Sequence, residues 1–247
     1  MRRFWSGATV VQTGAKYGVA LDGKPVRLPN GSALAVRFAA LANGIAMEWN
    51  VAKEDFAPAD LPLTQLAGTA IERIAPQRAG IVEALIRYGV NDLLCYRAED
   101  PELAAAEGRA WDPWLRWAQS RLGAALRFTH GVLPIGQPTE AAACFGAHIA
   151  SMDEFQLAGL GVIVPGLGSL VLGLAVAARE LSPDVACEVA ALDETWQEAR
   201  WGADQAAIAR RHAIAKEVAD AYHFMMLCSH EGDSFDYYGT GPGRRVS

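Results

Sequence analysis

The sequence predicts an α+β fold, with a small β-rich N-terminal domain followed by a larger all-helical C-terminal domain. Between residues 3 and 36 apolar and polar residues alternate, and glycine-containing turns interrupt the alternation. From Phe38 the apolar residues recur at helical spacing, and beyond residue 139 almost every segment has that period. We place the boundary in the polar, proline-containing segment 50–62, which predicts domains 1–60 and 61–247.

The N-terminal domain is expected to contain a hairpin. Tyr17, Val19 and Leu21 alternate along one strand, and Asp22-Gly23 is a typical hairpin turn. A second turn at Asn30-Gly31 precedes a short strand near residues 34–36. The apolar spacing of residues 38–49 then predicts the first helix.

The remaining chain reads as a series of helices. Residues 63–74 and 78–88 predict two short helices, while residues 91–96 fit either a strand or a buried helical turn. Pro101 is expected to begin a long helix that ends near Gly123, with Pro113 starting a second segment. Further helices are predicted at 139–151, 153–163, 167–179, 183–201 and 204–228. The glycine-rich tail from residue 231 is expected to be flexible.

Composition limits the possible partners and compartment. The chain of 247 residues has a net charge of −6, which argues against nucleic acid as a partner because phosphate binding needs clustered Lys and Arg. Its four cysteines form no CxxC pair and have apolar neighbours, so we expect free thiols and a reducing, cytoplasmic location. We expect a monomer.

Residues 157–178 contain no charged side chain, and the run is long enough to cross a bilayer. Pro165-Gly166 breaks the run near its middle, and no basic cluster or aromatic belt frames it. Glycine and alanine recur in it, as in helices that approach closely. We therefore predict a pair of buried helices and no stable membrane insertion.

In the helix predicted at residues 192–204, one residue does not fit the division into an apolar and an acidic side. Leu192 and Trp196 share an apolar side, and the acidic residues lie on the other, solvent-facing side. Trp201 falls among the acids. It either packs under a neighbouring helix or is offered to a partner, and these residues alone leave both open.

No pattern in the sequence identifies a catalytic site. Glu194 and Glu198 have the spacing of carboxylate-bridged metal sites, with His223 as a further ligand, so a carboxylate-centred metalloenzyme is the alternative function. Only half of that motif is present. A nucleophile elbow and a phosphate-binding loop are both missing from the sequence. We therefore predict a protein that is not an enzyme and uses neither metal nor cofactor.

Several stretches, in order, resemble one family: the assembly chaperones that bind the alpha subunit of the F-type ATP synthase. The resemblance spans about residues 3–228 and rests on short motifs within these segments: 3–5, 17–26, 41–49, 62–64, 92–99, 111–113, 168–169, 192–194 and 197–202. It implies a β-rich N-terminal part, a helical C-terminal part, and a chaperone that prevents aggregation of the free alpha subunit before it meets the beta subunit.

The resemblance also implies where the partner binds. The family's segment around Gln197 and Trp201 is the part carried over as functional. The partner-binding residues it implies here are Asp193, Glu194, Gln197, Glu198, Trp201 and Gly202.

Overall fold

Four strands build a small antiparallel sheet at the N-terminus of the computed structural model, which describes residues 1–229. Strand β2 pairs with all three others. The strands are β1 (Ala8–Thr13), β2 (Lys16–Leu21), β3 (Lys24–Pro25) and β4 (Ala35–Val36). The alternation around Val19 therefore predicted β2 correctly. The predicted flexible tail lies outside the described residues.

The turn between β2 and β3 has left-handed backbone at Asp22 (φ 46°) and Gly23 (φ 81°), as a tight hairpin requires. The Asp22 carboxylate also accepts hydrogen bonds from the backbone N–H groups of Ser6 and Gly7, each at 2.9 Å. These bonds lower the pKa of Asp22. The turn residue thereby fixes the chain that enters β1.

Helix α1 (Ala39–Val51) covers this sheet with the apolar residues that its sequence period predicted. Leu41, Ile45 and Trp49 are buried. Trp49 also packs edge-on against Trp5, with ring centroids 4.9 Å apart. The aromatic contact ties the first residues of the chain to the C-terminal end of α1.

Residues 62–90 form an almost continuous helical segment in place of the two separate helices predicted. It comprises α2 (Pro62–Thr69), a π-helical turn (Ala70–Ile74) and α3 (Ala75–Val90). The expected gap is reduced to a kink at Gln77, where φ is −116° and ψ is 21°. Pro76 follows a helical turn directly and lacks the N–H that would donate to it, which fits the kink at the next residue.

The ambiguous segment after α3 contains both structures that its pattern allowed: a 3₁₀ turn (Leu93–Cys95) and strand β5 (Tyr96–Arg97). Asp92, fully buried, precedes them. Its carboxylate accepts from the backbone N–H of Leu94 at 3.1 Å and from that of Val171 at 3.0 Å. Burial raises the pKa of Asp92 to about 6 despite these bonds. A buried carboxylate thus joins this turn to the start of α7 (Leu170–Ala177).

Helix α4 (Pro101–Trp117) runs through Pro113 without ending, so the second segment predicted there is wrong. A proline inside a helix removes one hydrogen bond and crowds the preceding turn. Trp111 and Ala118, both fully buried, hold α4 and the π-helical turn after it against the core on either side of the proline. Core burial outweighs the local preference to break.

Up to residue 229, the C-terminal half contains five further helices besides α7, and a short parallel pair of β5 with β6 (Thr129–His130) precedes them. Helix α6 continues through Pro165 and ends at Gly168 (φ 64°), later than predicted. The helix predicted at 183–201 is divided at Ala191. The five are α5 (Thr139–Ser151), α6 (Glu154–Leu167), α8 (Pro183–Ala190), α9 (Leu192–Trp201) and α10 (Gln205–Leu227).

Helices α6 and α7 contain the uncharged run and form the centre of the helical part. Small residues let neighbours approach: a Cβ on Gly159 would lie 2.4 Å from Met225 Cγ of α10, and one on Gly173 would lie 2.6 Å from Val164 Cγ2. Every residue of α7 is buried. Within residues 1–229, the helices are all too short or too polar to cross a membrane.

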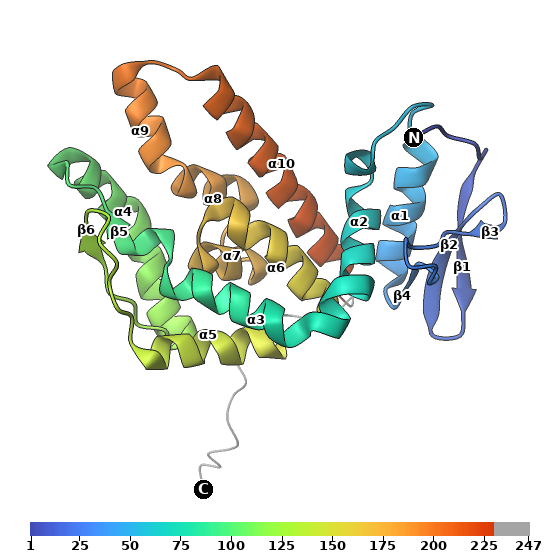
Figure 1. Ribbon diagram of the computed structural model, residues 1–247, viewed down its shortest axis with the longest axis horizontal. Coiled ribbons are helices and arrows are strands. Elements are labelled where there is room, and N and C mark those ends of the chain that lie inside the picture. Colours follow the sequence, from blue (N-terminus) through green and yellow to red (C-terminus); the bar gives the residue numbers. More distant parts are fainter. Residues whose placement is uncertain (230–247) are drawn as a thin grey trace, which may run out of the picture.

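Figure 1 shows the sheet and α1 at one end of the molecule and α4, β5 and β6 at the other, with α6 and α7 between them. Helices α9 and α10 form one edge and converge on the short connection between them. The predicted α+β class is confirmed. The division at residue 60 stays a prediction.

Candidate functional site

The helix that carries the predicted partner-binding residues is α9, which leaves α8 at a bend. The indole N–H of the buried Trp111 donates to the carbonyl of Val189 at 2.9 Å, just before this bend. At the other end, Gly202 has φ 98° and ψ 158°. Any residue with a Cβ is strained in this backbone conformation, so glycine is required there. Asp204 then caps α10 through the N–H of Ala206.

Arg200 anchors the apolar side of α9 to α4. Its guanidinium lies 3.8 Å from the ring centroid of Trp196, a cation–π arrangement. The same group pairs with Glu102 and, at 3.6 Å, with Asp100 at the N-terminus of α4. Sequence reasoning missed Arg200, although its position four residues after Trp196 places both on one helical face.

The acidic side of α9 faces α10 and is only partly the solvated surface expected from the sequence, since 46% of the Glu194 side chain is exposed. Glu194 accepts two hydrogen bonds from Arg210, both at 3.1 Å, and one from Arg211 at 3.2 Å. Glu198 accepts from Arg211 at 2.7 Å, and only 20% of its side chain is exposed. These bonds, led by that to Glu198, raise the pKa of Arg211.

The remaining predicted residues form no ion pair within residues 1–229. The carboxylate of the half-buried Asp193 accepts a 2.6 Å hydrogen bond from the exposed amide of Gln197. Gly202 is exposed as well. Trp201 is 75% exposed and touches Trp196 edge-on, with centroids 6.4 Å apart. Trp201 is therefore not packed under α10, and of the two positions that the sequence leaves open it occupies the exposed one.

The six predicted residues therefore divide into two groups. Glu194 and Glu198 hold α9 against α10, whereas Trp201, Gln197 and Gly202 form an exposed end and Asp193 lies at its border. An exposed tryptophan on a rigid helix end presents a large apolar surface at little entropic cost. This arrangement is suited to contact with a macromolecule.

The residues of the alternative metal site are not arranged to bind a metal ion. The carboxylates of Glu194 and Glu198 are occupied by arginines, and His223 lies about 18 Å along α10 from Arg211, at 1.5 Å per residue. Nowhere in the described part of the chain do three or more His, Cys, Asp or Glu side chains converge as a metal site would require.

Glu198→Lys is expected to destabilise the docking of α9. The substitution places a cation beside Arg211 and removes a partly buried ion pair, so we expect a loss of about 1–3 kcal/mol in the free energy of unfolding or of local opening. Hydrogen exchange of α9 amides measures the local effect. Glu188→Lys, on an exposed part of α8, is the matched charge reversal and should leave exchange unchanged.

The α+β fold and the exposed end of α9 suit a protein that binds a macromolecular partner. The sequence model of the ATP12 chaperone protein matches residues 2–119. The crystal structure of Atp12 from Paracoccus denitrificans superposes with a TM-score of 0.88 at 38% identity, covering 92% of this chain and 98% of that one. The chain belongs to the ATP12 chaperone family, whose members assist assembly of the ATP synthase.

Two other relatives agree with this assignment. A solved protein from Agrobacterium tumefaciens has a TM-score of 0.88 and 35% identity, over 92% of this chain and 86% of its own. Mitochondrial protein atp12 of Schizosaccharomyces pombe is 26% identical over 215 residues, which are 81% of this chain and 74% of the relative. The resemblance stated from the sequence motifs is thereby confirmed.

Proposed function

We propose that this chaperone binds the free alpha subunit of the F-type ATP synthase and prevents its aggregation until the beta subunit replaces the chaperone. Membership of a family that assists assembly of this enzyme supports an ATP synthase subunit as the client. The single observation that carries the proposed contact is the exposure of Trp201 at the end of α9.

The surroundings of Trp201 support its role as an anchor. Tryptophan is enriched among the residues that dominate interface energies, particularly when polar groups ring it and exclude water on binding. Gln197 and Asp193 supply such a rim along α9, and Arg200 fixes the helix beneath. We propose Asp193, Gln197, Trp201 and Gly202 as contacts, and Glu194 and Glu198 as the residues that hold α9 in position.

We propose the cytoplasm as the location. All four cysteines are free. Burial raises the pKa of Cys187 to about 11 and that of Cys95 to about 12, so both thiols stay protonated and unreactive near neutral pH. A reducing compartment is consistent with such thiols.

The proposal is tested by offering the purified chaperone isolated alpha and beta subunits separately. We expect co-purification with the alpha subunit only, and less light scattering when the alpha subunit is diluted from denaturant in its presence. Absence of binding to the alpha subunit at micromolar concentrations, or equal binding to both subunits, would contradict the proposal.

A further inference from the structure

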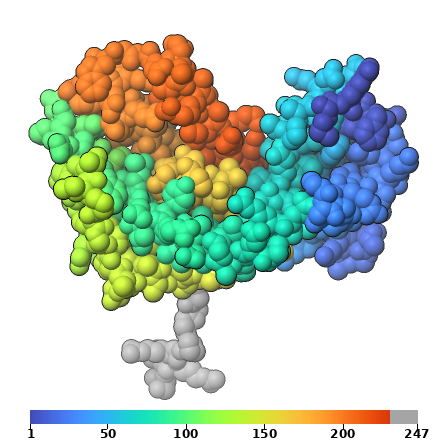
Figure 2. Space-filling view, viewed as in Figure 1, coloured from blue at the N-terminus to red at the C-terminus, as the bar shows by residue number. Residues whose placement is uncertain are grey.

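We infer that a groove between α2 and α10 binds an extended segment of the client in which a Lys or Arg lies next to an aliphatic side chain. The inference rests on the proposed function and adds a second contact, separate from Trp201. Figure 2 shows the surface hollowed between the cyan segment near residue 60 and the red segment of α10. The cavity at this place has a volume of about 470 Å³.

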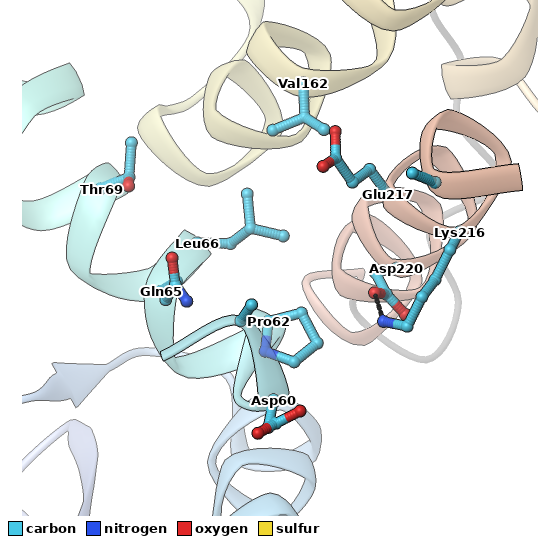
Figure 3. A pocket seen from close by; sticks show the side chains of 11 residues that line it. Asp60, Pro62, Gln65, Leu66, Thr69, Val162, Lys216, Glu217 and Asp220 are labelled. Atoms are coloured by element: carbon cyan, nitrogen blue, oxygen red, sulfur yellow. Dashed lines mark hydrogen bonds and ion pairs between the residues drawn. The ribbon is translucent and has the colours of Figure 1, made fainter. Parts of the chain in front are cut away.

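The groove has a predominantly apolar lining. Pro62 and Leu66 of α2, Val162 of α6 and Ala213 of α10 contribute side chains to it, and Thr69 closes one end (Figure 3). Leu66 is buried at the base, while Ala213 is exposed. An aliphatic side chain placed here would exchange water for apolar contacts, which stabilise by roughly 25 cal/mol per Å² buried.

Carboxylates give the groove its charge. Asp60 lies on the 3₁₀ turn before α2, and Glu217 points toward Val162 from α10 (Figure 3). Asp220 is neutralised by Lys216 at 2.6 Å. Asp60 uses one oxygen to accept from the N–H of Ala57, and Glu217 forms no ion pair within residues 1–229. Two uncompensated carboxylates thus flank an apolar floor.

This combination is complementary to one kind of occupant. A cationic side chain next to an aliphatic one would satisfy a carboxylate by charge-assisted hydrogen bonds and fill the floor at the same time. A cavity of about 470 Å³ holds a few side chains, not a helix or a folded domain. An extended chain segment with exposed side chains, as an unassembled subunit offers, meets these requirements.

The position of the groove favours the client over a second copy of the chaperone. The groove residues of α10 begin at Ala213, two residues after Arg211, whose side chain holds α9. Helix α10 begins at Gln205, four residues after Trp201, and Glu217 lies about 18 Å further along its axis. A client in contact with Trp201 can therefore reach the groove along the same helix.

Photo-crosslinking of the full-length chaperone to the isolated alpha subunit tests the inference. A benzoylphenylalanine replaces Gln65, which lines the groove and is exposed, or Glu83 of α3, which is exposed outside it. We expect adducts only from position 65, all to one client segment that contains Lys or Arg beside an aliphatic residue. Adducts to a second copy of the chaperone, or to scattered client sites, would overturn the inference.

Two substitutions complete the test. Glu217→Lys reverses the charge and Ala213→Trp fills the groove, and each should raise the dissociation constant for the alpha subunit at least about fivefold. Glu83→Lys, an exposed charge reversal outside the groove, should leave it unchanged. If the wild type binds and all three variants bind equally, the groove inference fails and the proposed function stands. If the wild type does not bind the alpha subunit, both fail.

Discussion

Trp201→Ala is expected to weaken binding to the alpha subunit by about tenfold or more, because a tryptophan that becomes buried at an interface centre commonly contributes 2 kcal/mol or more. The free energy of unfolding should change by less than about 0.5 kcal/mol, since the side chain is 75% exposed and contacts mainly Trp196. Titration of the isolated alpha subunit against each variant, with urea unfolding in parallel, measures both quantities.

Met47→Ala is the matched control for this prediction. Met47 lies on α1, in the N-terminal part of the chain, and is also largely exposed at 67%. The Met47→Ala variant should bind the alpha subunit as tightly as the wild type does. Equal weakening by both substitutions would mean that exposed apolar surface in general, and not the end of α9, holds the client. No weakening by Trp201→Ala would remove Trp201 from the contact.

Asp92→Asn is expected to abolish a large part of the pH dependence of stability. Asp92 is fully buried and its carboxylate receives backbone N–H groups from the 3₁₀ turn and from α7. Burial raises its folded-state pKa from 3.8 to about 6, so the folded protein binds a proton more tightly than the unfolded chain does. Ionised Asp92 therefore opposes folding.

The sign of the effect follows from that difference. At pH above 6 the penalty is fully present, and it is relieved as the pH falls through 6 toward 4, so the Asp92 contribution to stability increases on acidification. Between pH 7.5 and pH 5 the change is about 1–2 kcal/mol. Asparagine does not titrate. The stability of the wild type relative to the Asp92→Asn variant should therefore rise by that amount when the pH is lowered from 7.5 to 5.

The difference between the two proteins is the quantity to measure, by urea unfolding at several pH values. Burial also raises the pKa values of Glu48 and Glu107, which add changes of the same sign to both proteins. Subtraction removes those contributions. A stability difference that is constant from pH 5 to pH 7.5 would show that Asp92 has the same pKa in the folded and unfolded states.

The sequence predicted those elements that a periodic pattern specifies. The alternation around Val19 gave β2, the helical spacing of Leu41, Ile45 and Trp49 gave α1, and α5 has the predicted bounds. Pro113 and Pro165 were misread as breaks because their effect is local, whereas the burial that keeps both helices intact comes from other parts of the chain.

The candidate site was less predictable for the same reason. The helical period placed the acids of α9 on one side correctly, but it cannot say what that side faces. The partners of Glu198 and Glu194 are arginines on the next helix, and those of Arg200 lie on α4. Asp92 belongs to a motif that supported the family resemblance, yet its link to Val171 depends on the tertiary fold.

The arginines around α9 have a consequence for the kinetics of client capture. Glu194 and Glu198 are paired with Arg210 and Arg211, whereas Arg200 pairs with Glu102 and Asp100, so Asp193 has no ion pair within residues 1–229 and adds negative charge at this end. The association rate constant depends on the electric field of such charges, and salt screens it within about 10 Å at 0.1 M. Added salt should therefore slow capture through three carboxylates that form no ion pair in the described part of the chain, Asp60, Asp193 and Glu217, while Trp201 governs how long the client stays bound.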